Sequence, residues 1–419
     1  MGAATAACGI DFGTSNSTAA WAPQGRATLL ALEDGKATLP SVVFFHAEDA
    51  RVSYGREALA DYLVGDEGRL MRSLKSLLGT SMIDEHTEVA GRALPFRELL
   101  AQFIGELKRR AEKQAGQPFK RAVLGRPVFF VDDDPKADRQ AQDTLAGIAR
   151  SVGLKDIAFQ YEPIAAAFDY ESQISREELV LVVDIGGGTS DFCLVRLSPD
   201  RATRVERRDD ILASGGVHIG GTDFDKYLSL ASVMPSLGLG SRLQTGLVVP
   251  SGPYFNLATW HTINQVYSRK SWTLITELQR DALEPKKIER LQNLVEERAG
   301  HWLAMQVEAA KIALSDAPLT QMDLGRISVG ETLALHRADL DRAIGHLVER
   351  IELTVARLLK DAGIRADELD TVFFTGGSSG VPLLRERISA LLPNARAVEG
   401  DLFGSIGTGL AIDALRKFR

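Results

Sequence analysis

The sequence predicts an α/β protein made of two similar lobes that arose by duplication. One pattern, an apolar residue, Asp, another apolar residue and Gly followed by hydroxyl residues, occurs at 10–13 and again 173 residues later at 183–186. Apolar runs flank both copies, as expected for strands joined by a glycine-containing turn. Because strands alternate with helical patterns elsewhere, we expect two α/β lobes around a cleft, each contributing one of the repeated turns.

In the first half of the chain, apolar runs bounded by turn residues predict strands at 8–12, 18–21, 41–45, near 52 and at 122–128. The apolar residues between 99 and 107 recur at the spacing of one helix face, which predicts a helix packed on the core. Asp134 precedes Pro135, the typical start of a helix. This pairing favours a helix cap at Asp134 over a metal cluster with Asp132 and Asp133.

In the second half, strands are expected at 180–184, 192–197 and 371–375, and a terminal helix at 405–417. A helical pattern starts near Pro285 and carries apolar residues as far as Trp302. Between the strands at 192–197 and 371–375, a segment at about 226–307 holds three of the four tryptophans. Its aromatic residues predict either the core of a subdomain or a surface on which a protein partner docks.

Composition excludes several classes of protein. The chain is 45% hydrophobic and 25% charged, which is typical of a globular protein with a sizeable core. A net charge of -7 without a basic stripe argues against a nucleic-acid partner. No signal peptide or membrane span is recognisable, so we expect a cytoplasmic protein. Cys8 and Cys193 match no disulfide framework or metal spacing, and we interpret them as buried strand residues rather than redox sensors.

The repeated turns have the chemistry of phosphate loops. Their backbone amides can surround phosphate oxygens, and glycine allows the backbone to approach closely. Each turn follows a strand that ends in an aspartate, Asp11 or Asp184, where a phosphate-bound divalent cation needs oxygen ligands. A simple turn cap would explain either aspartate, but not their identical placement. The turn residues concerned are Gly13, Thr14, Ser15 and Asn16 in the first copy and Gly186, Gly187, Gly188 and Thr189 in the second.

Several segments resemble those of one family. Residues 9–17, 184–191 and 375–378 are similar to the phosphate-1, phosphate-2 and adenosine signatures of the actin-like ATPase superfamily. Within it the chain resembles the heat-shock-70 (DnaK-type) chaperones. The segments that carry this likeness are LKSLLG at 74–79, RPVFF at 126–130, EPIAAA at 162–167 and GGTDFD at 220–225. The match extends from about residue 9 to residue 410, and the short YegD-like members are the most similar.

The resemblance implies a duplicated actin-like (ribonuclease H-like) ATPase fold that binds ATP or ADP with Mg²⁺. It makes Lys75 the cation on the γ-phosphate, whereas a lysine on a solvated helix face is the alternative. Thr189 would orient the attacking water. Asp191 and Glu162 would organise water and metal, and Asp11 and Asp184 would hold Mg²⁺.

The resemblance also implies a site for the adenosine. Residues on its contact positions are Gly220, Gly221, Glu308, Lys311, Ser315, Gly376, Gly377, Ser378 and Asp401. The chain departs from the family where two arginines sandwich the adenine, because Ile312 and Gly380 stand at those positions. We therefore expect weaker and less base-selective binding.

The expected organisation is lobe I at 1–170 and lobe II at 171–419, with the terminal helix packing across the hinge. No segment resembles the linker and peptide-binding β-sandwich of full-length chaperones. We predict a slowly ATP-hydrolysing, chaperone-like or regulatory protein. Two alternatives stay open, a non-catalytic scaffold switched by nucleotide and a small-molecule kinase of the same superfamily. The G-x-S-x-G at 376–380 does not indicate an α/β-hydrolase, because no histidine follows Ser378.

Overall fold

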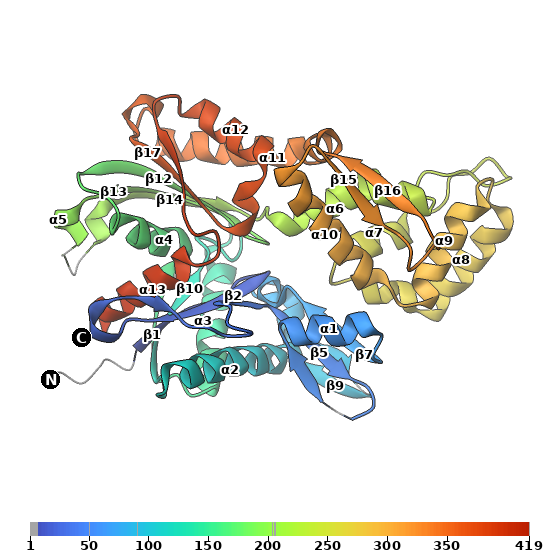
Figure 1. Cartoon of the computed structure of the whole chain (residues 1–419), viewed down its shortest axis with the longest axis horizontal. Helices are drawn as coiled ribbons and strands as arrows, with labels where there is room; N and C mark the ends of the chain where they lie inside the picture. Colours follow the sequence, from blue (N-terminus) through green and yellow to red (C-terminus); the bar gives the residue numbers. More distant parts are fainter. Residues whose placement is uncertain (1–6, 50, 90, 203, 205–206, 419) are drawn as a thin grey trace. The chain divides into compact units, whose positions relative to one another are not determined.

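The computed structural model describes residues 7–49, 51–89, 91–202, 204 and 207–418 (Figure 1). The chain divides into two compact units. The larger comprises Met1–Gly220, Arg350–Gly380 and Leu384–Arg419, and the smaller comprises Gly221–Glu349 and Val381–Leu383. The expected boundary between lobe I and lobe II, near residue 170, falls inside the larger unit, and it stays a prediction.

The larger unit contains two sheets with the same design. The first has the order β3-β2-β1-β10-β11, with β4 also pairing with β2, and the second has the order β14-β13-β12-β17-β18. In each, the first three strands named are antiparallel and the last three parallel. The strands are β1 (Ala7–Asp11), β2 (Asn16–Trp21), β3 (Thr28–Leu29), β4 (Thr38–Pro40), β10 (Arg121–Arg126), β11 (Asp156–Tyr161), β12 (Glu178–Ile185), β13 (Ser190–Leu197), β14 (Ile211–Val217), β17 (Thr371–Thr375) and β18 (Arg396–Glu399).

The matching sheets confirm the predicted duplication. The hairpin β1–β2 occupies the same place in the first sheet as β12–β13 in the second. One expected boundary is wrong, since β10 ends at Arg126 and not at residue 128. Pro127 has no N–H to donate, so it cannot continue a strand in the middle of a sheet.

Helices cover both sheets. β1 is buried along its whole length, as expected for a strand covered on both faces. Figure 1 shows α2 below the first sheet and α13 above it, and α13 also packs on α4, which covers the second sheet. The helices with residues in the larger unit are α1 (Arg56–Val64), α2 (Phe96–Ala115), α3 (Pro135–Ser151), α4 (Glu162–Glu171), α5 (Pro199–Ala202), α11 (Arg337–Asp361), α12 (Pro382–Leu391) and α13 (Ser405–Lys417). Helix α3 starts at the predicted cap, where the Asp134 carboxylate accepts from the amides of Lys136 and Ala137 at 3.1 and 3.0 Å.

Further strands between β4 and α2 form two smaller sheets in the larger unit. They form a three-stranded sheet in the order β6-β5-β7 and a separate hairpin, β8–β9. Their bounds are β5 (Val42–His46), β6 (Val52–Tyr54), β7 (Gly68–Arg72), β8 (His86–Val89) and β9 (Arg92–Pro95). A short 3-10 helix at Leu74–Leu77 follows β7 and carries Lys75.

The smaller unit is mostly helical. It contains α6 (Gly221–Leu228), α7 (Gly252–Ala258), α8 (Arg269–Asp281), α9 (Pro285–Glu296), α10 (Gly300–Asp316) and the hairpin β15 (Leu319–Asp323)–β16 (Thr332–His336). The single helix expected from Pro285 to Trp302 is wrong. Arg298 has a positive φ of 49° and separates α9 from α10, which carries Trp302. Tyr254 is fully buried and Phe255 is 48% exposed, so the predicted aromatic set is part core and part surface.

The two cysteines lie where the sequence predicts, buried in strands. Cys8 in β1 and Cys193 in β13 are free thiols with no exposed surface. Burial raises the pKa of each to about 12, so the reactive thiolate is suppressed.

In the part of the chain that the structure describes, no helix combines the length and the hydrophobicity that a bilayer crossing requires.

We predict that Gly409→Ala destabilises the protein by about 1–3 kcal/mol. A Cβ at Gly409 in α13 would lie 2.9 Å from the Cα of Ala165 in α4 and closer still to its carbonyl. The control is Gly147→Ala in α3, where a Cβ meets nothing within 4 Å. Because alanine favours a helix interior, this change should stabilise by about 0.5–1 kcal/mol. Urea denaturation measures both, and equal stability of the two variants would contradict the close packing of α13 on α4.

Candidate active site

The first repeated turn, between β1 and β2, is held in shape by Ser41. The amide of Ser41 donates to the carbonyl of Ser15 at 2.9 Å, and its hydroxyl donates to the carbonyl of Gly13 at 2.7 Å. Ser41 is fully buried, which shields the donor side of both hydrogen bonds from water. A serine from outside the motif therefore fixes the turn whose amides are expected to meet phosphate.

The second turn is closed by its own backbone. The amide of Gly186 donates to the carbonyl of Thr189 at 2.9 Å, and Asp184 and Asp191 are paired across the β12–β13 ladder. The buried hydroxyl of Ser190 donates to the carbonyl of Ile219 at 2.7 Å. This bond fastens the strand after the turn to the loop that contains Gly220.

The two turns face each other at close range. A Cβ built on Gly188 would lie 3.0 Å from Oγ1 of Thr14, and one built on Gly187 would collide with the hydroxyl of Ser15. A Cβ on Gly220 would lie 2.5 Å from the amide of Gly188. At Gly220 the obstacle is backbone, so glycine is required there, whereas at Gly187 and Gly188 a side chain would have to displace the hydroxyl groups of Ser15 and Thr14. The structure therefore brings together the phosphate-loop residues predicted from the two halves of the repeat.

Next to the turns, four carboxyl groups gather around one lysine. Asp11 is the last residue of β1 and Asp184 the last but one of β12, Asp191 follows the second turn, and Glu162 begins α4. Lys75 is buried and donates a hydrogen bond to Glu162 within an ion pair. All five groups are buried, so their charges interact through little water.

The surroundings shift the pKa values of these groups strongly. Burial, together with the charge of Glu162, raises the pKa of Asp11 and of Asp191 to about 7. The same causes raise the pKa of Asp184 well above its usual range. Burial alone would lower the pKa of Lys75, but the charges of Glu162 and Asp11 raise it, which keeps the ammonium protonated. One cation faces more negative charge than it can neutralise.

The donor set therefore fits a divalent cation. Oδ1 of Asp184 and Oδ2 of Asp191 are buried without a hydrogen-bond partner among the residues that the structure describes. Carboxylate oxygens are the ligands that Mg²⁺ prefers, usually with several waters retained. Buried oxygens left without donors are a cost to the fold that a cation or its water ligands would remove.

The remaining predicted site residues belong to two groups. In the larger unit, Gly376 has a positive φ of 79° and lies against Asp184, Gly377 is exposed, and Ser378 is buried. Asp401 is exposed and accepts from the amide of Phe403 at 3.1 Å.

The other group lies in the smaller unit. Gly221 begins α6, and Glu308, Lys311 and Ser315 lie on α10. Lys311 is buried and donates to the carbonyl of Gly221 at 3.1 Å, and its Nζ lies 2.8 Å from Asp225. The hydroxyl of Ser315 donates to the carbonyl of Lys311 at 3.3 Å. Their contacts with adenosine stay predictions.

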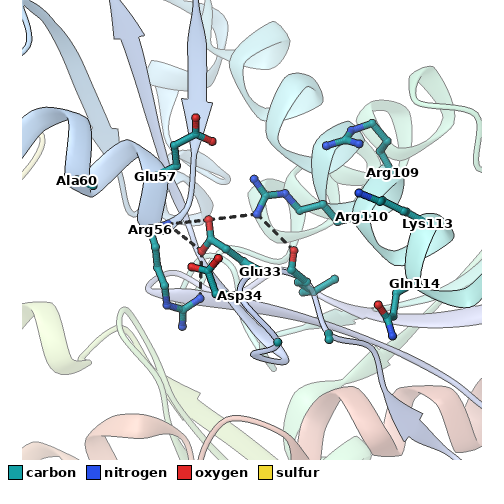
Figure 2. A pocket seen from close by; sticks show the side chains of 12 residues that line it. Glu33, Asp34, Arg56, Glu57, Ala60, Arg109, Arg110, Lys113 and Gln114 are labelled. Carbon is teal, nitrogen blue, oxygen red and sulfur yellow. Dashed lines mark hydrogen bonds and ion pairs between the residues drawn. The ribbon is translucent and has the colours of Figure 1, made fainter.

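Two other features of the larger unit do not form part of this site. A pocket of about 800 Å³ beside α1 and α2 contains none of the predicted site residues (Figure 2). Within it Glu33 already pairs with two cations, at 3.1 Å from Arg56 and 3.2 Å from Arg110.

A cluster of His46, Asp61 and Asp66 has the residue types of a metal site. However, Nη2 of Arg51 lies 3.6 Å from each of its carboxylates. The guanidinium already supplies the positive charge that a metal ion would bring.

Two residues that shape the site are not predicted as site residues from the sequence. Ser41 is outside every motif, and Arg126 belongs only to a segment that resembles the family. Arg126 is bonded to Asp138 in the first turn of α3, at 2.7 and 2.9 Å. A buried arginine needs a partner, so an arginine in a predicted strand indicates that an acidic residue lies nearby. The sequence does not indicate which acidic residue this is.

The duplicated sheets and their facing turns define the actin-like ATPase fold, as predicted. The model of one family, described as Hsp70 protein, matches residues 7–233 and 275–414. The chain belongs to the Hsp70 family. Chaperone protein HscA from Citrobacter koseri is 28% identical over 431 residues, which cover 98% of this chain and 58% of the relative. The same protein from Klebsiella pneumoniae and from Escherichia coli gives the same identity and coverage. The chain thus spans little more than half the length of the curated relatives it matches.

We predict that Asp184→Asn stabilises the nucleotide-free protein by about 1 kcal/mol at pH 8. Because the folded-state pKa values of Asp11 and Asp191 lie near 7, the folded protein binds more protons than the unfolded chain between about pH 4 and pH 7. Stability should therefore fall as the pH rises through this interval. Removing one carboxylate should make that fall smaller.

Urea denaturation at several pH values measures this effect. Asp132→Asn is the control, because a hydrogen bond from His218 lowers the pKa of Asp132 despite partial burial. That variant should not gain stability at pH 8. An Asp184→Asn protein with the wild-type pH dependence would show that the carboxylates do not repel one another.

Proposed function

We propose that this chain binds Mg-ATP and hydrolyses it slowly to ADP and phosphate. The observation that supports this most is the set of buried carboxylates and Lys75 beside two facing glycine turns, in a chain of the Hsp70 family. Such a set is unfavourable by itself, and a phosphate-bound cation would compensate its charge. Phosphoryl transfer depends mainly on positioning and on charge neutralisation, which these groups would supply.

Each group then has a chemical role. The amides and hydroxyls of the first turn (Gly13, Thr14, Ser15 and Asn16) and of the second (Gly186, Gly187, Gly188 and Thr189) would bind the β- and γ-phosphate oxygens. Asp11 and Asp184 would hold Mg²⁺, through water. When bound, Mg²⁺ would neutralise phosphate charge.

Lys75 would place its ammonium on the γ-phosphate, with Glu162 fixing its position. Thr189 would orient the attacking water, and Asp191 would accept a hydrogen bond from it. Attack by this water would break the bond from the γ-phosphorus to the bridging oxygen and release ADP.

The adenosine would be held more loosely than the phosphates. We propose that Gly220, Gly221, Gly376, Gly377 and Ser378 contact the nucleotide through their backbone, and that Glu308, Lys311, Ser315 and Asp401 contact the ribose and the base. Ile312 is 57% exposed and offers only an apolar surface. At Gly380, where the family pattern has an arginine, a Cβ meets nothing within 4 Å, so a side chain can begin there without a clash.

We propose a chaperone-like or regulatory role, exercised together with a protein partner on the segment 226–307. Two observations support this. The family model leaves residues 234–274 unmatched, and this stretch exposes Leu247, Val248 and Phe255. Likeness to the YegD-like members and a cytoplasmic location are further parts of the proposal.

We predict that Mg-ATP and Mg-ADP raise the melting temperature of the protein. Ligand at a hundred times its Kd should add about 2.7 kcal/mol of stability. Lys75→Ala should lower the turnover of ATP by about 10²–10³-fold, because a charge aimed at the γ-phosphate is lost. Lys108→Ala is the matched control, since it removes a lysine–glutamate pair on α2, away from the site. Thermal-shift titration and phosphate release measure these effects.

Three results would change this proposal. Wild-type turnover in Lys75→Ala would refute the role of Lys75. No binding of Mg-ATP by the wild type would refute the whole proposal. Binding without turnover would favour the nucleotide-switched scaffold.

We also predict a micromolar Kd for ATP and a Kd for GTP within about tenfold of it. An arginine stacked on adenine contributes about 0.5–2 kcal/mol, and both arginines of the family pattern are absent. Gly380→Arg should tighten ATP binding and increase the preference for adenine. Calorimetric titration of both nucleotides into both proteins makes the comparison. Nanomolar, strictly adenine-selective binding by the wild type would show that other residues have replaced the sandwich.

A further inference from the structure

Arg126, the last residue of β10, forms a clamp around the chain that follows it. Its Nε donates to the carbonyl of Pro127 at 3.0 Å, and its Nη2 donates to the carbonyl of Val128 at 3.1 Å. The same Nη2 contacts both carboxylate oxygens of Asp138, at 2.9 and 2.7 Å, and Nη1 donates to Gln142 at 2.6 Å. The aromatic rings of Phe130 and Tyr161 lie 5.0 and 5.3 Å from it. Arg126 therefore fixes the turn between β10 and α3 from several directions at once.

Asp138 strengthens the clamp from the other side. Its Oδ1 also accepts from the amide of Phe130 at 2.6 Å. One carboxylate thus binds the arginine and the backbone that the arginine encloses. Arg126 is 7% exposed, so its bonds to charged and carbonyl oxygens are largely shielded from water. A lysine could not reproduce the arrangement, because an ammonium lacks the planar fork of donors.

The clamped turn ends at the candidate active site. The amide of Val128, enclosed between the two carbonyls that Arg126 binds, donates to Oδ1 of Asp191 at 2.6 Å. The other oxygen, Oδ2, is buried without a hydrogen-bond partner among the described residues. The Val128 amide therefore determines which oxygen of Asp191 is engaged and which is available.

We propose that Arg126 is a positioning residue for ATP hydrolysis: by fixing the Val128 amide, it holds Asp191 with Oδ2 available to the attacking water or to the metal's water ligands. This inference rests on the proposed function, because it assumes that Asp191 acts in hydrolysis. Arg126 itself would touch neither nucleotide nor metal. Its effect passes through one backbone N–H to one carboxylate.

The chain offers a matched control for the loss of a buried arginine. Arg207 is 6% exposed, forms a bidentate bond with Glu171 at 2.7 Å for both contacts, pairs with Asp210 and lies 5.3 Å from the ring of Phe168. None of these partners is a predicted site residue. Arg207→Met should therefore cost stability as Arg126→Met does, without reaching Asp191.

The experiment compares the wild type with Arg126→Met, Arg126→Lys and Arg207→Met. Phosphate release gives kcat, calorimetry gives the Kd for Mg-ADP, and thermal denaturation gives stability. In the nucleotide-free protein, ¹³C NMR of the aspartate carboxyls, assigned with Asp191→Asn, follows the pKa of Asp191. This last measurement does not depend on turnover. Arg126→Lys keeps the buried charge and serves if Arg126→Met does not fold.

We expect both Arg126 variants to lower kcat about 10–100-fold while the Kd for Mg-ADP changes less than about threefold. The pKa of Asp191 should rise by about one pH unit, because the amide bond that favours its ionised form is weakened. In a plot of kcat against pH, the low-pH limb should shift to higher pH together with this pKa. Arg207→Met should retain the wild-type kcat and the wild-type pKa of Asp191.

Wild-type kcat and an unchanged pKa of Asp191 in a folded Arg126 variant would overturn the inference. So would equal losses of kcat in Arg126→Met and Arg207→Met, since they would report stability alone. If the wild type does not hydrolyse ATP, the proposed function fails by itself. The pKa of Asp191 then still decides whether Arg126 controls that carboxylate.

Discussion

The structure depends on a buried electrostatic imbalance, in which one lysine faces four carboxyl groups. Carboxylates removed from water without enough positive charge are among the least favourable arrangements in a protein. Here burial and mutual repulsion raise the pKa values of Asp11, Asp184 and Asp191, so part of the charge is carried by protons. A protein keeps such a cluster when a ligand brings the missing charge, because groups prearranged for that charge need little reorganisation.

The rest of the larger unit holds these groups in place. Asp11 and Asp184 stand at equivalent ends of two equivalent strands, β1 and β12, which are fixed by parallel and antiparallel neighbours on either side. Lys75 and Glu162 come from elements outside the repeat, a 3-10 helix after β7 and the first residue of α4. Duplication thus supplies a symmetrical pair of acids, and elements between the two copies of the repeated turn make the site asymmetric. A site with one cation on one side can distinguish the two ends of a bound molecule.

Much of this arrangement could be predicted from the sequence, for identifiable physical reasons. The repeated turns have local signatures, so the positions of Asp11 and Asp184 and the duplication of the sheets follow from spacing alone. The break at Arg298 could not be predicted, because a positive φ at an arginine leaves no mark in the apolar pattern of α9 and α10. Nor could the bond from Ser41 to the first turn. The Ser41 hydroxyl reaches a backbone carbonyl 28 positions away, and a carbonyl is an acceptor that every residue carries.

The close approach of α4 and α13 has a mechanical consequence. Ala165 of α4 lies against Gly409 of α13, and each helix also packs on a different sheet of the larger unit. Larger side chains surround this point, since the guanidinium of Arg416 in α13 lies 4.4 Å from the ring of Phe168 in α4. At the point itself no side chain of Gly409 separates the two backbones, so the helices are as close as their main chains allow. The spacing of the two sheets therefore depends on the missing methyl group of one glycine, and a side chain added there would push the helices apart.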